Sequence, residues 1–143
     1  MIIAVDFDAT VVHQVRPYSD LYQPLSLMPG AKAGLEALHR AEHTLILCSS
    51  RANRALRVDW RLNPLWRLFT PEQIQGWESS RGFHEARFQQ MRGFVEAVLP
   101  GLFAAIDEGL QGKVLADLFI DDKSQRFGAR GLLWEQIATT WGV

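Results

Sequence analysis

The chain has 143 residues, of which 48% are apolar and 22% are charged, and its formal net charge is −1. This composition is typical of one soluble globular domain and excludes disordered, coiled-coil and collagen-like chains. The balance of 15 basic against 16 acidic residues also excludes a polycation that binds nucleic acid through bulk charge.

A single cysteine, Cys48, excludes an internal disulfide. It lies in an apolar run, which predicts a buried thiol in a reducing compartment. Met1 leads directly into apolar residues without a basic leader, and no run approaches the roughly 18 apolar residues of a membrane span. We therefore expect one cytoplasmic domain over residues 1–143, with no membrane partner.

Four short apolar runs are predicted to be strands. They are rich in Ile, Val, Leu and Phe and too short for surface helices, which is typical of parallel strands buried on both faces. In chain order the runs cover residues 2–5, 45–48, 102–106 and 114–120, the last of them interrupted by Asp117.

Helical spacing separates these runs. Apolar residues at intervals of three and four predict one helix after Pro29-Gly30, one that ends before Pro100-Gly101, and one at the C-terminal end. Residues 52–62 are compatible with a further helix that ends before Pro64. Strands that alternate with helices predict an α/β fold of three layers, with a doubly wound, mostly parallel sheet.

Two stretches interrupt the alternation. Residues 11–27 contain Pro17 and Pro24 and are expected to form an extended loop or a hairpin. Residues 62–83 carry two prolines, two glycines and nearby tryptophans, which predicts a small insertion. This insertion would be a subsidiary cluster packed on the sheet, or a lid over a substrate.

Polar residues follow three of the four apolar runs. Asp6 and Asp8 come after the first, Ser49 and Arg51 after the second, and Asp121-Asp122 after the last. Because ligands bind at the carboxyl ends of the strands in an open parallel sheet, these side chains are predicted to share one edge.

Crowded carboxylates at this edge indicate a cation. Asp6 and Asp8 are two residues apart, so in an extended chain they point to the same side, and Asp121 and Asp122 would lie nearby. Like charges at this density repel each other unless a cation compensates. Oxygen ligands suit Mg²⁺ bound together with a substrate phosphate.

The run Asp6-Phe7-Asp8-Ala9-Thr10 resembles the first motif, Asp-x-Asp-Gly-Thr, of the haloacid dehalogenase (HAD) superfamily of phosphohydrolases. Ser49, Lys113 and Asp121-Asp122 follow in the order of the later family motifs, and residues 112–122 resemble the joined third and fourth motifs of members with a small cap. The resemblance covers most of the sheet and leaves residues 62–83 outside. It implies a HAD-like Rossmannoid fold with a minimal cap.

The resemblance also implies the chemistry. Asp6 would attack phosphorus and form an aspartyl-phosphate, while Asp8 would act as general acid and base. Mg²⁺ would be bound by Asp6, Asp8 and one or both of Asp121 and Asp122. Contacts to the phosphate would come from Ser49, Lys113 and Thr10, with Thr10 also supporting the turn. Apart from the resemblance, Arg51 is a further candidate for phosphate binding because it directly follows Ser49-Ser50.

Some residues depart from the motif or have open roles. Ala9 stands where the family has glycine, so a positive φ there would strain the backbone. His13 and Arg16 follow the first motif, and either face substrate or lie on the surface. The arginines at 51, 54, 57, 61 and 67 alternate with Trp60 and Trp66, and form either a solvated helix face or a platform for a phosphate-rich or nucleotide substrate.

The expected function is therefore Mg²⁺-dependent hydrolysis of a phosphate monoester, whose substrate is a small molecule, a nucleotide or an oligonucleotide. Family members with a small cap often close the site by forming a homo-oligomer or act on bulky substrates. The alternative is a non-hydrolytic module, either receiver-like or used for phosphate binding and interaction. Asp8, two residues after the candidate nucleophile, favours hydrolysis over a stored phosphate.

Overall fold

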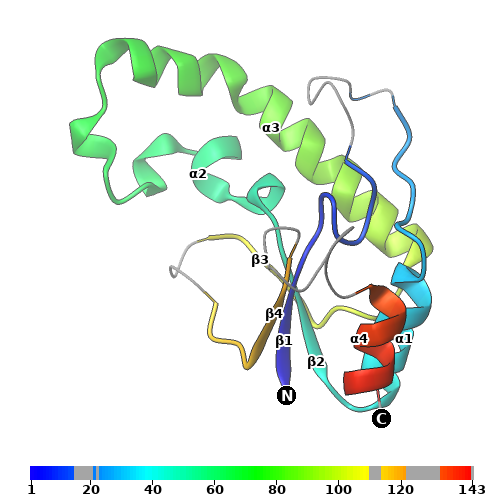
Figure 1. Cartoon of the computed structure of the whole chain (residues 1–143). Helices are drawn as coiled ribbons and strands as arrows, with labels where there is room; N and C mark the ends of the chain where they lie inside the picture. Colours follow the sequence, from blue (N-terminus) through cyan, green and yellow to red (C-terminus); the bar gives the residue numbers. More distant parts are fainter. Residues whose placement is uncertain (15–20, 22, 110–113, 122–132, 143) are drawn as a thin grey trace.

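The chain folds around one parallel sheet. The computed structural model describes residues 1–14, 21, 23–109, 114–121 and 133–142. Four strands lie in the order β3-β2-β1-β4, so that β1 is flanked on both sides (Figure 1). All pairs are parallel, which confirms the predicted α/β class. The bounds are β1 (Ile2–Asp6), β2 (Thr44–Cys48), β3 (Ala105–Asp107) and β4 (Leu118–Ile120).

The two edge strands are shorter than the apolar runs that predicted them. Leu102 is buried in the core ahead of β3, and the Ala104 amide donates to the Leu45 carbonyl at 2.8 Å just before the strand begins. On the other edge, Asp117 joins the sheet where β4 starts. Its carboxylate accepts the Ile2 amide at 2.7 Å, and its own amide donates to the Ile2 carbonyl at 2.8 Å.

Three main helices accompany the sheet, namely α1 (Ala31–Arg40), α3 (Pro71–Val98) and α4 (Trp134–Trp141). Their positions confirm the helices predicted after Pro29-Gly30, before Pro100-Gly101 and near the C-terminal end. No helix in the described part of the chain is long and apolar enough to cross a membrane.

The single helix predicted over residues 52–62 is wrong. This stretch holds three short pieces because polar side chains repeatedly cap the backbone. Asn53 Oδ1 accepts the Ala55 amide, and Asp59 Oδ1 accepts the Arg61 amide, both at 2.9 Å. The pieces are η1 (Ser50–Ala52), α2 (Arg54–Arg57) and η2 (Trp60–Leu62), and η3 (Trp66–Leu68) follows them.

Residues 62–83, predicted as a small insertion, contain η3 and the first part of α3. Thr70 Oγ1 accepts the Gln73 amide at 3.2 Å, and Gln73 Oε1 accepts the Thr70 amide at 2.9 Å. This capping box, with Pro71 in the first turn, starts a helix that continues for 28 residues. Gly76 and Gly82, which were among the features that predicted an interruption of the alternation, lie inside α3.

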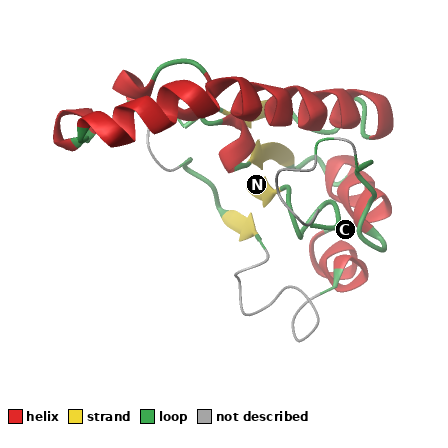
Figure 2. Cartoon of the chain, turned by 90° about the horizontal axis from the view of Figure 1, so that it is seen from above, coloured by secondary structure: helices red, strands yellow, loops and turns green. Residues whose placement is uncertain are grey.

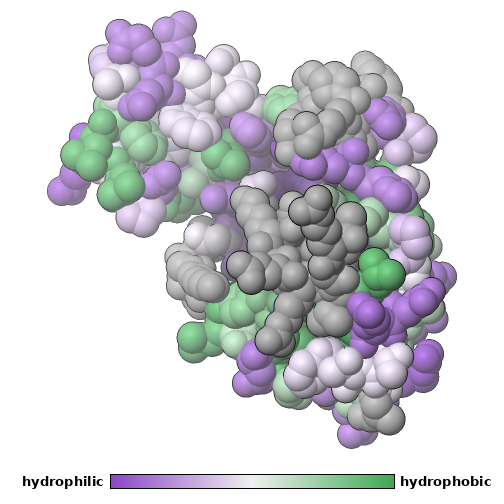
Figure 3. Space-filling model, in the orientation of Figure 1, coloured by the Kyte–Doolittle hydropathy of each residue, from purple (hydrophilic) through white to green (hydrophobic). Residues whose placement is uncertain are grey.

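The N-terminal half of α3 and the short helices α2, η2 and η3 form an arm beside the sheet (Figure 1). Trp60, Trp66, Phe69 and Trp77 contact one another there, with ring centroids 5.9 to 6.3 Å apart. Their partial burial makes them a small aromatic cluster of the arm. Leu62, Leu65 and Leu68 are exposed in this arm. Apolar atoms lie among hydrophilic ones at this end of the molecule in Figure 3.

The arginines of the arm have separate partners and do not share one solvated face. Arg57 is buried, lies 3.8 Å above the Phe88 ring, and forms ion pairs with Glu85 at 3.2 Å and Glu108 at 2.6 Å. Arg57 thereby connects α2 to α3 and to the residue after β3. Arg61 and Arg67 lie over the rings of Trp60 and Trp66, respectively.

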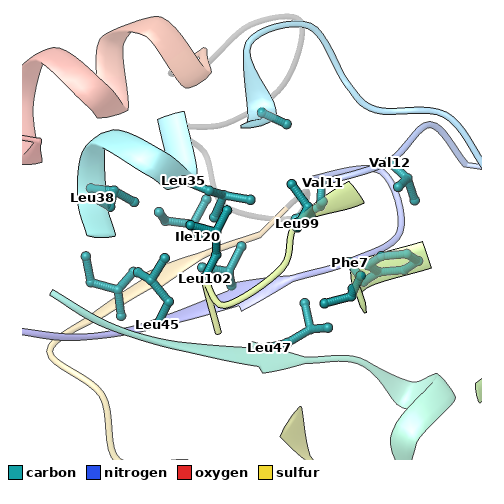
Figure 4. Close-up of a cluster of buried hydrophobic side chains, with 14 of the residues drawn as sticks. Phe7, Val11, Val12, Leu35, Leu38, Leu45, Leu47, Leu99, Leu102 and Ile120 are labelled. Carbon is teal, nitrogen blue, oxygen red and sulfur yellow. The ribbon is translucent and has the colours of Figure 1, made fainter. Parts of the chain in front are cut away.

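The main core lies against one face of the sheet. Ile3, Val5, Leu45, Leu47 and Ile120 share this face through the strand register and pack with buried residues of α1, α3 and α4 (Figure 4). Seen from above, the strands are viewed close to end-on, and the long helix α3 runs across the view (Figure 2). Buried residues of α1, α3 and α4 thus belong to one hydrophobic core.

Trp134 connects this helical layer to the loop after β1. Its ring is 1% exposed, and its Nε1 donates to the Thr10 carbonyl at 2.8 Å. The ring fits against α1 because Gly34 has no side chain: a Cβ at that position would lie 2.6 Å from Trp134 Cε3. Gly34 therefore allows the close contact that positions the loop.

We expect Gly34→Ala to lower the free energy of unfolding by about 1–3 kcal/mol, since overpacking must displace the Trp134 ring. Chemical denaturation followed by circular dichroism measures the change. Gly93→Ala is the matched control, because Gly93 is an exposed helical position with no atom within 4 Å of the added Cβ, and it should gain about 0.5–1 kcal/mol. Equal stability of Gly34→Ala and the wild type would show that Trp134 is not tightly packed there.

Candidate active site

The candidate site lies at the carboxyl edge of the sheet. Asp6 ends the inner strand β1 and is in register with Cys48 at the end of β2, which is in register with Asp107 at the end of β3. On the other side, Val5 is in register with Ile120, so Asp121 directly follows the strand that pairs with β1. The sheet thus brings Asp6 and Asp121 to one edge, as the sequence predicted.

A tight loop follows Asp6. The Phe7 carbonyl accepts the amides of Thr10, Val11 and Val12 at 3.3, 2.9 and 3.2 Å. This turn requires a left-handed residue, and Ala9 has a φ of 60°. The positive φ anticipated for the glycine position of the motif is therefore present, with alanine in its place.

Thr10 lies inside the protein and not on the substrate side of this loop. Its side chain is fully buried, and Oγ1 has no hydrogen-bond partner among the described residues. Its carbonyl accepts the Trp134 indole. Thr10 therefore supports the loop, as expected, whereas a direct contact to phosphate does not agree with its burial.

Ser49 follows β2 and begins η1. Its Oγ accepts the Arg51 amide at 3.2 Å, so the hydroxyl acts as the cap of this turn. A hydroxyl that accepts through a lone pair keeps its own hydrogen for donation. Ser49 can therefore cap η1 and donate to an anion at the same edge as Asp6.

Asp8 is bound by Arg51. The guanidinium donates from Nε to Asp8 Oδ2 at 2.8 Å and from Nη2 to Oδ1 at 2.7 Å. The Arg51 side chain is only 3% exposed and that of Asp8 18%, so this bidentate pair is largely shielded from water. Arg51, which was predicted to bind phosphate, thus binds Asp8, the predicted general acid and base.

Helix α3 supplies two further groups that the sequence analysis missed. Gln90 Oε1 accepts Arg51 Nη1 at 2.9 Å, and Arg87 Nη2 lies 3.9 Å from Asp8 Oδ2. Both residues alternate with the core residues Phe88 and Met91 along α3. That alternation marks them as polar positions bordering a buried face, but it does not show that the face turns toward Asp8.

The strand edge is electronegative at Cys48. Burial raises the pKa of its thiol most, followed by the carboxylates of Asp107 and Asp6, to about 11. The thiol is partly buried, less than the sequence predicted, and is protonated at neutral pH. Cys48 is therefore not an activated nucleophile.

Other predicted residues have different outcomes. Lys113, Asp122 and Arg16 lie outside the described residues, so their predicted roles stay predictions. His13 is exposed, and its backbone amide donates to the Ser26 carbonyl at 2.9 Å, which holds the loop after β1 against residues 25–28.

The carboxylates at this edge of the sheet fit a magnesium ion bound by few protein ligands. Within the described ranges, no three His, Cys, Asp or Glu side chains converge on one point. Mg²⁺ usually takes one or two carboxylates and completes its coordination with water and substrate phosphate. Asp6 and Asp121, at the ends of neighbouring strands, provide such a pair.

Comparisons with protein-family models, with curated proteins and with solved structures found no match for this chain. The functional inference therefore depends on the residues and on their arrangement.

The raised pKa of Cys48 can be tested because it is the only thiol. Alkylation of the folded chain by iodoacetamide should be slow at neutral pH and should accelerate toward about pH 11. Asp107→Asn should lower the pKa and speed the reaction at a given pH, whereas the distant Asp59→Asn should not. The folded thiol loses its proton at a higher pH than the unfolded thiol. The free energy of unfolding should therefore fall as pH rises from 9.0 to about 11.

Ala9→Gly tests the strain in the loop. Relief of the left-handed alanine, about 1–2 kcal/mol, is partly offset by the greater chain entropy of glycine, so we expect a gain of up to about 1 kcal/mol. Thermal denaturation measures it. Ala86→Gly, at an exposed position inside α3, should instead lose about 1 kcal/mol. A loss at position 9 equal to that at position 86 would contradict the strained turn.

Proposed function

We propose that this chain hydrolyses phosphate monoesters through an aspartyl-phosphate on Asp6. The observation that carries the proposal is the position of Asp6 at the end of an inner strand, between β2, which is followed by Ser49, and β4, which is followed by Asp121. The HAD resemblance requires these three residues at one edge, and the strand order is consistent with that requirement. The HAD-like, three-layer form of the fold belongs to the same proposal.

The first step is attack by a carboxylate oxygen of Asp6 on phosphorus. The P–O bond to the leaving alcohol breaks as the acyl phosphate forms. The hydroxyl of Ser49 donates a hydrogen bond to a phosphoryl oxygen, and Lys113, by the resemblance, neutralises its charge. Water then attacks the same phosphorus and releases phosphate and the free Asp6 carboxylate.

Asp8 handles the proton in both steps. It protonates the oxygen of the leaving alcohol and then accepts a proton from the attacking water. Each of its oxygens accepts one hydrogen bond from Arg51. A carboxylate oxygen has a second lone pair, which can take up the proton. Arg51 is therefore a positioning residue in this mechanism, because it orients Asp8 for proton transfer.

Mg²⁺ would be held by Asp6 and Asp121, with the Asp8 carbonyl and Asp122 as further ligands by the resemblance, and would screen the anionic nucleophile from the anionic substrate.

The Arg51–Asp8 pair also favours a second candidate. If the hydrogen bonds to Arg51 keep Asp8 away from the reacting groups, Asp8 neither protonates a leaving alcohol nor activates water. A phosphoryl donor with a good leaving group would still phosphorylate Asp6, and the acyl phosphate would persist. The chain would then store phosphate as a receiver-like, non-hydrolytic module. The two candidates share the chemistry of Asp6 and differ in the lifetime of the acyl phosphate.

Steady-state hydrolysis tests the proposal. A panel of aryl phosphate, sugar phosphates, nucleotides and phosphorylated oligonucleotides is incubated with and without Mg²⁺. We expect turnover that requires Mg²⁺ and that disappears in Asp6→Asn, since amide nitrogen cannot form the acyl phosphate. Asp8→Asn should slow turnover by about 10²–10⁴-fold and should accumulate phosphorylated Asp6, detected by mass spectrometry.

Glu96→Gln is the control for loss of a carboxylate, because this side chain is 67% exposed on α3, and it should keep full activity. A wild-type chain that accumulates a long-lived phosphorylated Asp6 would favour the storage module. A folded chain that neither turns over nor becomes phosphorylated on any substrate would contradict both candidates.

A further inference from the structure

Two arginines lie beside Asp8, although one already satisfies it. Arg51 occupies both carboxylate oxygens of Asp8 at 2.7 and 2.8 Å. Arg87 lies 3.9 Å from the nearer oxygen, outside hydrogen-bond range but inside the range of strong electrostatic interaction. The Arg87 side chain is 13% exposed, so α3 holds a second, mostly shielded guanidinium at this point.

An aromatic ring and an imidazole lie near Arg87 on α3. Its guanidinium carbon lies 5.9 Å from the centroid of the Phe83 ring, one turn earlier on α3. The ring of His84 contacts Phe83, with centroids 5.5 Å apart. Burial, and then the charge of Arg87, lower the pKa of His84, so this imidazole is neutral at neutral pH and adds no competing charge. Phe83, His84 and Arg87 form a wall of α3 beside Asp8. This wall carries one cation next to an aromatic ring and a neutral imidazole.

The location of this wall defines which part of a substrate it would contact. In the proposed function, on which this inference rests, Asp8 protonates the leaving oxygen. Groups next to Asp8 on α3 therefore lie beside the leaving alcohol, and Ser49 lies beside the phosphoryl group. A guanidinium binds phosphate or carboxylate through two parallel hydrogen bonds.

We propose that Arg87 selects phosphate esters whose leaving alcohol carries a second anionic group, a phosphate or a carboxylate. The geometry makes Arg87 a specificity residue, since it would contact the substrate away from the reacting phosphorus. A neutral alcohol such as glycerol would leave the guanidinium without this contact.

Paired substrates test the selection. Phosphoglycerate is compared with glycerol phosphate, and fructose bisphosphate with fructose phosphate, so that a carboxylate and a second phosphate are tested separately. The wild type should prefer the doubly anionic member of at least one pair by about tenfold or more in kcat/KM. Arg87→Gln should remove that preference, mainly through KM, and Arg87→Lys should keep part of it.

Arg92→Gln is the matched control, because Arg92 lies on the same helix, more than half exposed and paired with Glu96. It should leave the preference unchanged. Equal losses of kcat/KM for both members of each pair in Arg87→Gln would show a merely structural role and overturn the inference. A wild type without any preference would overturn it as well.

A binding measurement separates this inference from the proposed function. Calorimetry with the non-hydrolysing Asp6→Asn chain measures the affinity for phosphoglycerate and fructose bisphosphate, with and without Arg87→Gln. If no substrate is hydrolysed but binding still falls about tenfold without Arg87, the proposed hydrolysis fails and the anion site stands. If binding is independent of Arg87, the anion site fails whatever the activity.

Discussion

The bidentate pair of Arg51 and Asp8 holds together the parts of the candidate site. Arg51 lies just after β2, Asp8 lies in the loop after β1, and the third nitrogen of the guanidinium binds Gln90 on α3. A buried ion pair contributes little net stability, because desolvation offsets the attraction, but the loss of one partner costs about 3–5 kcal/mol. The pair therefore fixes the relative positions of these three segments more than it stabilises the fold.

A second constraint acts on the other side of the same loop. Trp134 reaches the Thr10 carbonyl from α4, across the space left by Gly34 on α1. The loop between Phe7 and Val12 is thereby held at two points. Trp134 of α4 binds the Thr10 carbonyl, and Arg51 binds the Asp8 carboxylate. A preorganised loop matters for the proposed chemistry, since a nucleophile and an acid two residues apart must keep their geometry through both steps.

The sequence predicted the features that depend on local pattern. Short apolar runs identified all four strands, and the rule that ligands bind at the carboxyl ends of parallel strands placed Asp6, Ser49 and Asp121 at one edge. It failed at two places for different reasons. Thr70, Pro71 and Gln73 are a local start signal for α3, and the sequence analysis gave the two glycines more weight than this signal. The target of Arg51 depends on how the loop after β1 turns toward α3, and no pattern of neighbouring residues contains that information.

The described charges divide the site into two sides of opposite sign. Along the strand edge, Asp6, Cys48 and Asp107 are in register, and burial raises the pKa of the Cys48 thiol most, with the two carboxylates adding to it. Along α3, Arg87 stands beside the Asp8 pair, and burial lowers the pKa of His84 most, with the charge of Arg87 adding to it. Carboxylates at the strand edge favour a cation and Arg87 favours an anion, so the proposed reaction of an anionic ester at Asp6 with a bound Mg²⁺ would use both. This opposition of charges across the loop after β1 is the physical argument for a phosphate ester as the proposed substrate.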